Sequence, residues 1–261
     1  MGETATRDAF LGGRVRLWQP RNGYRAGVDP VLLAASVEAR AGQSVLDLGC
    51  GVGAAALCLA ARVPGVEVTG LERQADYAAL ARRNAAENHA GFEVVEGDLS
   101  AMPAALKACQ FDHVIANPPY YDRARGTAAR DRGREAALGE ATPLALWVEM
   151  AAKRLCPKGY ATFIQRAERL PDLLSAFHTH LGSVELWPLT PRTGRASQLI
   201  LIRGRKGGRA DFRLHDGLVL HEGAAHDGDR ESYTPPVRAA LRDGAALRFP
   251  RDPDRHALTQ T

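Results

Sequence analysis

The chain has 261 residues, of which 45% are apolar and 25% charged, a balance that supplies enough apolar side chains for a sizeable core. No apolar run approaches the roughly 20 residues of a membrane-spanning helix, and the N-terminus lacks the basic start and apolar centre of a secretory signal. The net charge of +4 and the pI near 9.0 indicate a mild preference for anionic partners.

Short apolar runs alternate with amphipathic, alanine-rich stretches from Ser44 onward. The runs predict strands at 45–49, 66–72, 92–98, 111–117, 157–165, 183–189 and 197–205. The stretches between them predict helices at 54–63, 75–89, 102–108, 143–156 and 166–182. Thr142 is expected to cap the fourth of these helices, with Pro143 at its first position.

This alternation predicts a Rossmann-like, doubly wound α/β fold. We expect a mostly parallel seven-stranded sheet with helices on both faces and an antiparallel hairpin at one edge. The chain is divided into an N-terminal segment at 1–43, a core domain at 44–205 and a C-terminal extension at 206–261 that packs on the same domain. The tail from Arg248 is polar and is expected to be loose.

The cysteines and histidines show no spacing typical of a metal site. The four cysteines form no C-x-x-C pair, which argues against disulfides and zinc and favours a reducing compartment. His178 and His180 are two residues apart and so do not share a helix face. We therefore expect a cytoplasmic protein that binds no metal and no membrane.

A glycine-rich turn follows the first predicted strand in the sequence VLDLGCGVGAAA. Gly49, Gly51 and Gly53 allow a ligand to approach the backbone, and the following helix N-terminus offers free N–H groups. Glu72, at the end of the next strand, is placed to accept hydrogen bonds from ribose hydroxyls. The same spacing fits NAD, so the glycines alone leave the ligand open.

Asp47, two residues before the first glycine, distinguishes the possible ligands. A carboxylate at this position repels a pyrophosphate and attracts a cation. S-adenosylmethionine carries a sulfonium and an ammonium group and has no phosphate. Asp47 therefore favours this methyl donor over NAD, and we expect Asp98, at the end of the third strand, to contact the adenine edge of the donor.

The fourth predicted strand ends in Asn117 and is followed by Pro118, Pro119 and Tyr120, which we predict as the catalytic residues. Prolines cannot join a strand ladder, so this corner is rigid. The side-chain oxygen of Asn117 and the carbonyl of Pro118 can each accept one N–H of a planar amine, which turns the nitrogen lone pair toward a methyl group. Tyr120 can stack on the substrate, whereas Tyr121 is equally well a packing residue.

The order of these motifs resembles that of class I S-adenosylmethionine-dependent methyltransferases. The resemblance covers about 45–205 and rests on D-x-G-x-G-x-G at 47–53, Glu72, Asp98 and N-P-P-Y at 117–120. It implies the class I methyltransferase fold, with the catalytic domain at 44–205, S-adenosylmethionine as cofactor, and an N-methyltransferase in which Asn117 also lies beside the donor.

Two further stretches extend the resemblance to about 10–243. GYRAGVDPVLLAA at 23–35 and the pattern that begins PRTGRASQLILIRGRKGG are similar to bacterial enzymes that methylate adenine N6 in the anticodon region of a valine tRNA. This resemblance implies a tRNA partner and an N-terminal segment that closes over the donor.

In that family the segment places Tyr24, Arg25 and Asp29 near the amino-acid end of the donor. Judged from the residues alone, Asp29 is equally well the N-cap of the apolar run VLLAASV. The chain departs from the family at Pro30, where a small residue is expected, and in an arginine loop that is longer than usual.

This loop, at 122–135, follows the N-P-P-Y corner, where phosphates that flank a flipped base are expected. Arginine suits phosphate contacts, although a solvated loop with no ligand is the alternative. The predicted nucleic-acid-binding residues are Arg123, Arg125, Arg130, Arg132 and Arg134. RGRKGGR at 203–209 is a second basic patch, expected on the same face.

We therefore weigh three functions. The first is transfer of a methyl group to adenine N6 in tRNA. The second changes the acceptor to a guanine or cytosine of ribosomal RNA or to a protein glutamine amide. The third is an inert RNA-binding module, which the intact run of motifs from Asp47 to Asn117 disfavours.

Overall fold

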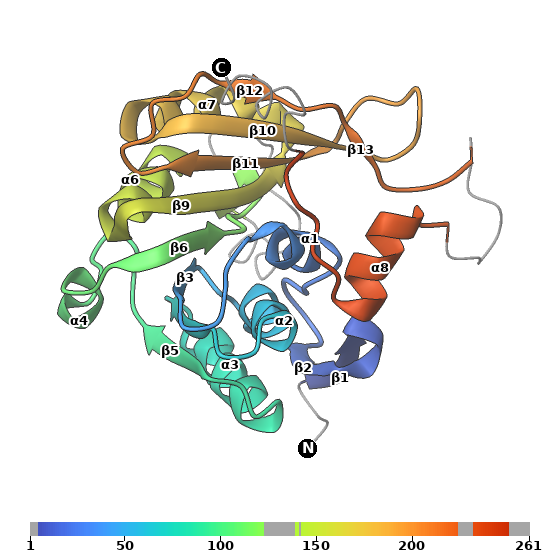
Figure 1. The fold of residues 1–261 in the computed structure, drawn as a ribbon. Helices are drawn as coiled ribbons and strands as arrows, with labels where there is room; N and C mark the ends of the chain where they lie inside the picture. The colour runs from blue at the N-terminus through green and yellow to red at the C-terminus, as the bar shows by residue number, and fades with distance from the viewer. Residues whose placement is uncertain (1–4, 123–138, 141, 224–231, 251–261) are drawn as a thin grey trace.

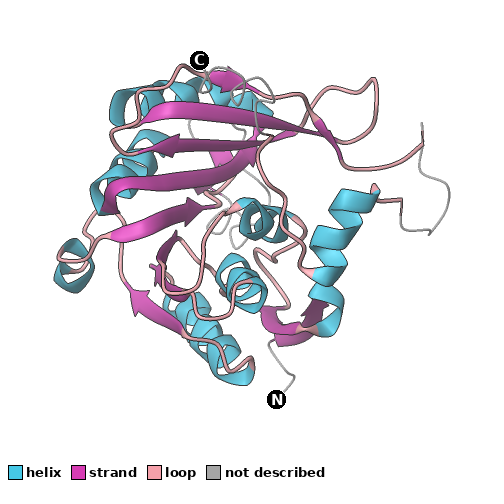
Figure 2. Cartoon of the chain, in the orientation of Figure 1, coloured by secondary structure: helices cyan, strands magenta, loops and turns pink. Residues whose placement is uncertain are grey.

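A computed structural model of the protein describes residues 5–122, 139–140, 142–223 and 232–250. Within these residues the chain folds into a twisted sheet with helices on both faces, as Figures 1 and 2 show. The doubly wound α/β fold is thereby confirmed.

Seven strands of the sheet correspond to the predicted ones. They are β3 (Ser44–Leu48), β4 (Glu67–Glu72), β5 (Phe92–Glu96), β6 (Phe111–Ala116), β9 (Leu155–Arg166), β10 (Gly182–Thr190) and β11 (Leu199–Arg205). They lie in the order β10-β11-β9-β6-β3-β4-β5, and β11 runs antiparallel to both of its neighbours. The predicted hairpin of β10 and β11 is therefore present, with its second strand inserted between β9 and β10.

Two short strands continue the sheet beyond the predicted edge. β12 (Arg213–Leu214) and β13 (Leu218–Val219) each pair in parallel with β10. The described residues therefore form a nine-stranded sheet, to which residues beyond 205 contribute directly. The division of the chain into parts at 1–43, 44–205 and 206–261 stays a prediction.

The helices divide between the two faces of the sheet. They are α1 (Asp29–Ser36), α2 (Ala54–Arg62), α3 (Ala75–Glu87), α4 (Ala104–Lys107), α6 (Leu144–Arg154), α7 (Leu170–His180) and α8 (Pro235–Asp243). One hydrophobic cluster joins α1, α2, α3 and α8, and the other joins α4, α6 and α7. Val45 belongs to the first cluster and Leu46 to the second, because successive residues of a strand point to opposite faces.

The N-terminal segment contains a hairpin that the sequence did not reveal. β1 (Ala5–Phe10) and β2 (Val15–Pro20) are antiparallel and are joined by a 3₁₀ turn at Leu11–Gly13. Asn84 of α3, fully buried, accepts a hydrogen bond from the Trp18 N–H (2.7 Å) and donates to the Trp18 carbonyl (3.1 Å). This amide fastens the hairpin to the sheet domain.

Two predicted caps are absent from the structure. The residue before α6 in the cap position is Pro143 itself, with ψ of 141°, and no side chain caps the helix, so the prediction for Thr142 is wrong. α1 begins at Asp29 with Val28 as its N-cap. The Asp29 side chain does not cap that helix, so the alternative in which Asp29 is only an N-cap is also wrong.

The segment after α8 corrects the expectation of a loose tail from Arg248. Phe249 is buried, and its ring lies 5.4 Å from that of Trp187 and 5.9 Å from that of His215. Phe249 therefore anchors this part of the chain in the core, and residues 251–261 lie outside the described residues.

The described residues contain no helix that is both long and apolar enough to cross a membrane. They also bring together no group of three or more histidine, cysteine or carboxylate side chains that can hold a metal ion.

Candidate active site

The register of the parallel strands brings the predicted motifs to one edge of the sheet. Leu48 pairs with Leu71 and with Ala116, and Glu72 pairs with Glu96. The turns that follow β3, β4, β5 and β6 therefore lie next to one another. This carboxyl edge is where ligands bind in open α/β sheets.

The glycines between β3 and α2 have different tasks, although all three have positive φ. A Cβ atom on Gly49 would lie 2.6 Å from the Trp147 ring, and one on Gly53 would lie 2.6 Å from the Phe92 ring. A Cβ on Gly51, with φ of 56°, would meet nothing within 4 Å. Gly49 and Gly53 therefore allow close packing, and Gly51 leaves its backbone open to a ligand.

Asp47 is a buried carboxylate with an unsatisfied oxygen. Its Oδ2 atom has no hydrogen-bond partner among the described residues. Burial, aided by the nearby charge of Glu72, raises the pKa of Asp47 to about 8. An isolated carboxylate is costly to bury, so this atom is suited to a cationic group of a ligand.

Glu72 is also buried, but both of its oxygens already accept backbone hydrogen bonds. Oε2 accepts from the Gly51 N–H (2.9 Å) and Oε1 from the Gln74 N–H (2.8 Å). Each carboxylate oxygen has two lone pairs, so one acceptor position remains on each. Glu72 can therefore shape the glycine turn and still accept from a ligand hydroxyl.

Asp98 lies just beyond β5 and is more open to solvent. Its Oδ1 atom accepts from the N–H (2.7 Å) and the hydroxyl (2.6 Å) of Ser100. These two hydrogen bonds lower the pKa of Asp98, which keeps this carboxylate ionised near neutral pH.

The Asn117 side chain is held by the N-terminal segment. Its Nδ2 atom donates to the hydroxyl of Tyr24 (3.2 Å), while its Oδ1 atom is buried and has no partner among the described residues. The Tyr77 hydroxyl of α3 accepts from the Tyr24 N–H (2.9 Å) and donates to the Tyr24 carbonyl (3.1 Å). The amide therefore presents its acceptor atom to the site.

Gln165, at the end of β9, is a site residue that the sequence did not single out. It is fully buried, and its Nε2 atom donates to the carbonyls of Pro118 (3.2 Å) and Pro119 (3.4 Å). Its Oε1 atom accepts from the Arg166 N–H (2.8 Å). A polar residue that ends an apolar strand, as Asn117 also does, is the signal that would have found it.

The Tyr120 side chain is hydrogen-bonded to α1. Its hydroxyl donates to Asp29, and burial together with this carboxylate raises the pKa of Tyr120. The Arg166 guanidinium lies 5.6 Å from the centre of the Tyr120 ring. Burial raises the pKa of Asp29, although the Tyr120 hydrogen bond and the Arg166 charge act against this rise.

Arg25 does not join the other predicted residues. Its guanidinium donates to Thr6 Oγ1 (2.7 Å) and to the Pro20 carbonyl (2.7 Å) and forms an ion pair with Asp8. It therefore braces the β1–β2 hairpin. The five arginines predicted to bind nucleic acid lie outside the described residues, at 123, 125, 130, 132 and 134.

Comparison with known proteins identifies several relatives of the chain. The family model described as "Methyltransferase small domain" matches residues 26–133. A tRNA1(Val) (adenine(37)-N6)-methyltransferase of Porphyromonas gingivalis is 33% identical over 226 residues, which are 82% of this chain and 88% of the relative. A release factor glutamine methyltransferase of Salmonella typhimurium is 46% identical, but over only 30% of this chain and 27% of its own length.

Among solved structures, a predicted O-methyltransferase from Agrobacterium tumefaciens is similar over most of its length. It superposes with a TM-score of 0.68 at 28% identity and covers 85% of this chain and 99% of its own.

From the raised pKa of Asp47 we predict how the stability of the protein depends on pH. This pKa of about 8, against a usual value of 3.8, means that the folded protein keeps a proton that the unfolded chain has released. The contribution of this proton to the free energy of unfolding is fully present below about pH 4 and is lost as the pH rises toward 8. Asp47→Asn cannot titrate, so its free energy of unfolding should decline less between pH 5 and 8. Urea unfolding at several pH values measures this, and an equal decline in both proteins would contradict it.

Proposed function

Because the chain belongs to the family of the tRNA1(Val) (adenine(37)-N6)-methyltransferases, we propose that it methylates the N6 amine of adenine 37 in a valine tRNA. It is an S-adenosylmethionine-dependent methyltransferase by family and by fold. The adenine acceptor is supported by this relationship, and transfer to a planar amine is supported by the Oδ1 atom of Asn117 in the N-P-P-Y corner, which is buried and has no partner among the described residues.

The residues at the glycine turn fit the methyl donor. When bound, S-adenosylmethionine supplies an electrophilic methyl group on a sulfonium. Asp47 offers the cationic amino-acid end a buried carboxylate oxygen that no described residue partners, and Gly51 leaves space beside its backbone. In the proposed arrangement Glu72 accepts from the ribose hydroxyls and Asp98 contacts the adenine edge.

Two acceptors orient the substrate amine in the proposed mechanism. The lone pair of an exocyclic amine is delocalised into the base, so the amine is a weak nucleophile until its two N–H groups are held. Asn117 Oδ1 accepts one and the Pro118 carbonyl accepts the other, since Gln165 uses only one lone pair of that carbonyl. The lone pair then points at the methyl group, and rigid acceptors lower the barrier because they need no reorganisation.

Transfer leaves the nitrogen with one proton too many. Neither acceptor titrates near neutral pH, so we propose that this proton passes to water. Tyr120 is held by Asp29 and by the Arg166 guanidinium above its ring, and the proposed role of its face is to stack on the adenine.

We propose that the N-terminal segment, 1–43, closes over the donor. Tyr24 and Asp29 are its contacts with the N-P-P-Y corner, and Tyr77 fixes the backbone at Tyr24. Arg25 serves this arrangement indirectly, since it braces the hairpin from which the segment continues.

The arginine loop at 122–135 is proposed to bind the RNA backbone on either side of the target base. Its position directly after the corner supports this role, as does the preference of arginine for phosphate. A cytoplasmic location follows from the tRNA substrate and is proposed with it.

Methylation of tRNA by purified protein tests the function. With an unmodified valine tRNA transcript and labelled S-adenosylmethionine, the wild-type protein should form N6-methyladenosine. Asn117→Ala removes one of two preorganised acceptors and should lower kcat by about 10²- to 10³-fold. Its affinity for the donor, measured by calorimetry, should change little, because Asp47 and Glu72 remain in place.

Label in a guanine or cytosine of the transcript and none in adenine would overturn the adenine acceptor. Full activity of Asn117→Ala would contradict the proposed role of the corner. Absence of donor binding to the wild-type protein would contradict the mechanism as a whole.

The contact of Tyr24 with Asn117 generates a separate prediction. Tyr24→Phe removes the hydroxyl that fixes the amide, so kcat should fall by about 10- to 100-fold, or about 1.4–2.7 kcal/mol in the barrier. The donor affinity and the midpoint of thermal unfolding should stay near those of the wild type. Tyr233→Phe, which removes a tyrosine hydroxyl outside this site, is the control. A change confined to KM would indicate that Tyr24 only binds a ligand.

A further inference from the structure

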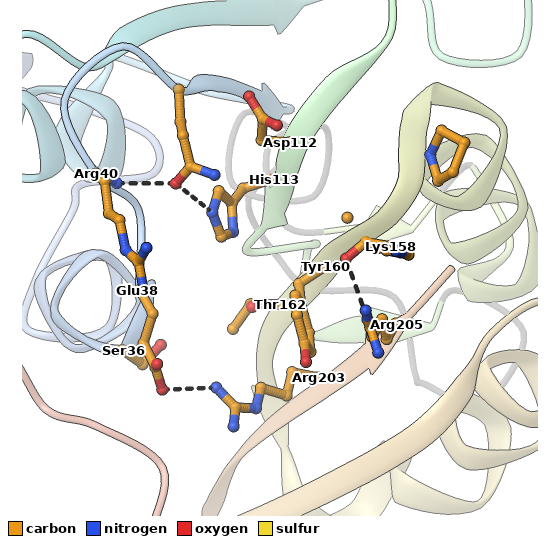
Figure 3. A pocket seen from close by; sticks show the side chains of 13 residues that line it. Ser36, Glu38, Arg40, Asp112, His113, Lys158, Tyr160, Thr162, Arg203 and Arg205 are labelled. Atoms are coloured by element: carbon orange, nitrogen blue, oxygen red, sulfur yellow. Dashed lines mark hydrogen bonds and ion pairs between the residues drawn. The ribbon is translucent and has the colours of Figure 1, made fainter. Parts of the chain in front are cut away.

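A second candidate site lies at the other end of the sheet. A pocket of about 500 Å³, the amino-edge pocket, opens where β3 and β6 begin. Figure 3 shows Arg40 and Glu38 on one side of it and Lys158, Tyr160 and Arg205 on the other. Its volume is in the range of pockets that hold small ligands.

This pocket is separate from the candidate active site. His113, which lines it, lies at the start of β6, whereas Asn117 follows the end of the same strand. Arg205 of β11 pairs with Tyr160, and Tyr160 pairs with His113, so both lie at the same amino edge. The basic patch at 203–209 is therefore not on the face of the N-P-P-Y corner, and the expectation that it is was wrong.

The carboxylates of the pocket are already engaged within the protein. Asp112 Oδ2 accepts from the Ser44 N–H (2.9 Å) and hydroxyl (3.1 Å). Glu38 forms an ion pair with Arg203 (2.9 Å). Burial lowers the pKa of His113, which keeps this imidazole neutral near pH 7. The negative charge of the pocket is thus offset or bound by hydrogen bonds.

Three cationic groups remain for a ligand. The Arg40 guanidinium and the Lys158 ammonium are exposed and make no hydrogen bond or ion pair with another described residue. Arg205 donates from Nε to the Lys158 carbonyl (3.3 Å), and its two terminal nitrogens make no hydrogen bond or ion pair with another described residue. The pocket therefore carries positive charge that the described residues do not neutralise.

The backbone at Lys158 is a second, independent observation. Lys158 has φ of 71°, in the left-handed region that favours glycine. A Cβ on the next residue, Gly159, would lie 2.7 Å from the Asp112 carbonyl, so close packing requires glycine there. A residue other than glycine that holds this backbone conformation at a pocket rim points to a use for its side chain.

We propose that the amino-edge pocket binds a phosphate group. Arginine and lysine are the residues that hold phosphate in proteins, arginine through its planar pair of donors. The phosphate belongs either to the RNA backbone away from the methylated base or to a free phosphorylated small molecule. The RNA source rests on the proposed function, and the free source does not.

The test uses the full chain and the variant Arg40→Gln/Lys158→Gly. Glycine suits the left-handed backbone at 158, so this variant removes two charges without adding strain. Arg16→Gln/Arg238→Gln, which removes two charges from β2 and α8, is the matched control. Donor affinity, measured by calorimetry, should be equal in all three proteins.

The first arm measures thermal unfolding with inorganic phosphate added at constant ionic strength. Phosphate should raise the midpoint for the wild type and the control but not for the pocket variant, because a ligand stabilises only the protein that binds it. The second arm measures the salt dependence of binding to the valine tRNA transcript. Loss of two phosphate contacts should reduce the log–log slope by about 1–2 relative to the control.

The two arms separate the sources of the phosphate. A reduced slope assigns the pocket to RNA, and an unchanged slope with phosphate stabilisation assigns it to a free ligand. No stabilisation and an unchanged slope would overturn the proposal. If the wild type methylates no tRNA, the proposed function fails, while the phosphate arm still decides whether the pocket binds an anion.

Discussion

The hydrogen bond from Asn117 Nδ2 to the Tyr24 hydroxyl joins the N-terminal segment to the end of the central strand β6, and the other contacts of the site support it. Tyr77 holds the backbone of Tyr24 from α3, and Gln165 holds the carbonyls of Pro118 and Pro119 from β9. The donor of this amide is thus engaged, while its buried acceptor has no partner among the described residues. The proposed chemistry needs an acceptor that is fixed before the substrate arrives, because reorganisation during the reaction would raise the barrier.

The electrostatics of the carboxyl edge are set by two neighbouring buried carboxylates. Asp47 and Glu72 lie buried side by side, and Glu72 is stabilised by two backbone N–H groups, whereas Asp47 Oδ2 has none among the described residues. Because Asp47 is buried, its pKa is raised in the protein without a ligand. A cationic ligand offsets it, since an opposite charge nearby favours the ionised carboxylate. The buried oxygen of Asp47 that no described residue partners is thus the feature that best separates a sulfonium donor from a pyrophosphate.

Much of the sheet domain was predictable, because each of the seven predicted strands between Ser44 and Arg205 contains an apolar run. The glycine turn and the N-P-P-Y corner were equally visible, since both place unusual residues directly at strand ends. The β1–β2 hairpin was missed because β1 has polar and apolar residues in equal number and is mostly not buried, and its attachment depends on Asn84, which is distant in sequence. The contacts of Gln165, Tyr77 and Arg25 are likewise long-range, and residue type alone does not report them.

The central claim is that this protein methylates adenine N6 in a valine tRNA, and mass spectrometry of tRNA nucleosides tests it most directly. Valine tRNA is purified from cells that carry the gene, from cells that lack it, and from deleted cells that express Asn117→Ala. We predict N6-methyladenosine at position 37, the position in the name of the Porphyromonas gingivalis relative, in the first sample only. The same amount of N6-methyladenosine at that position in all three samples would contradict the claim.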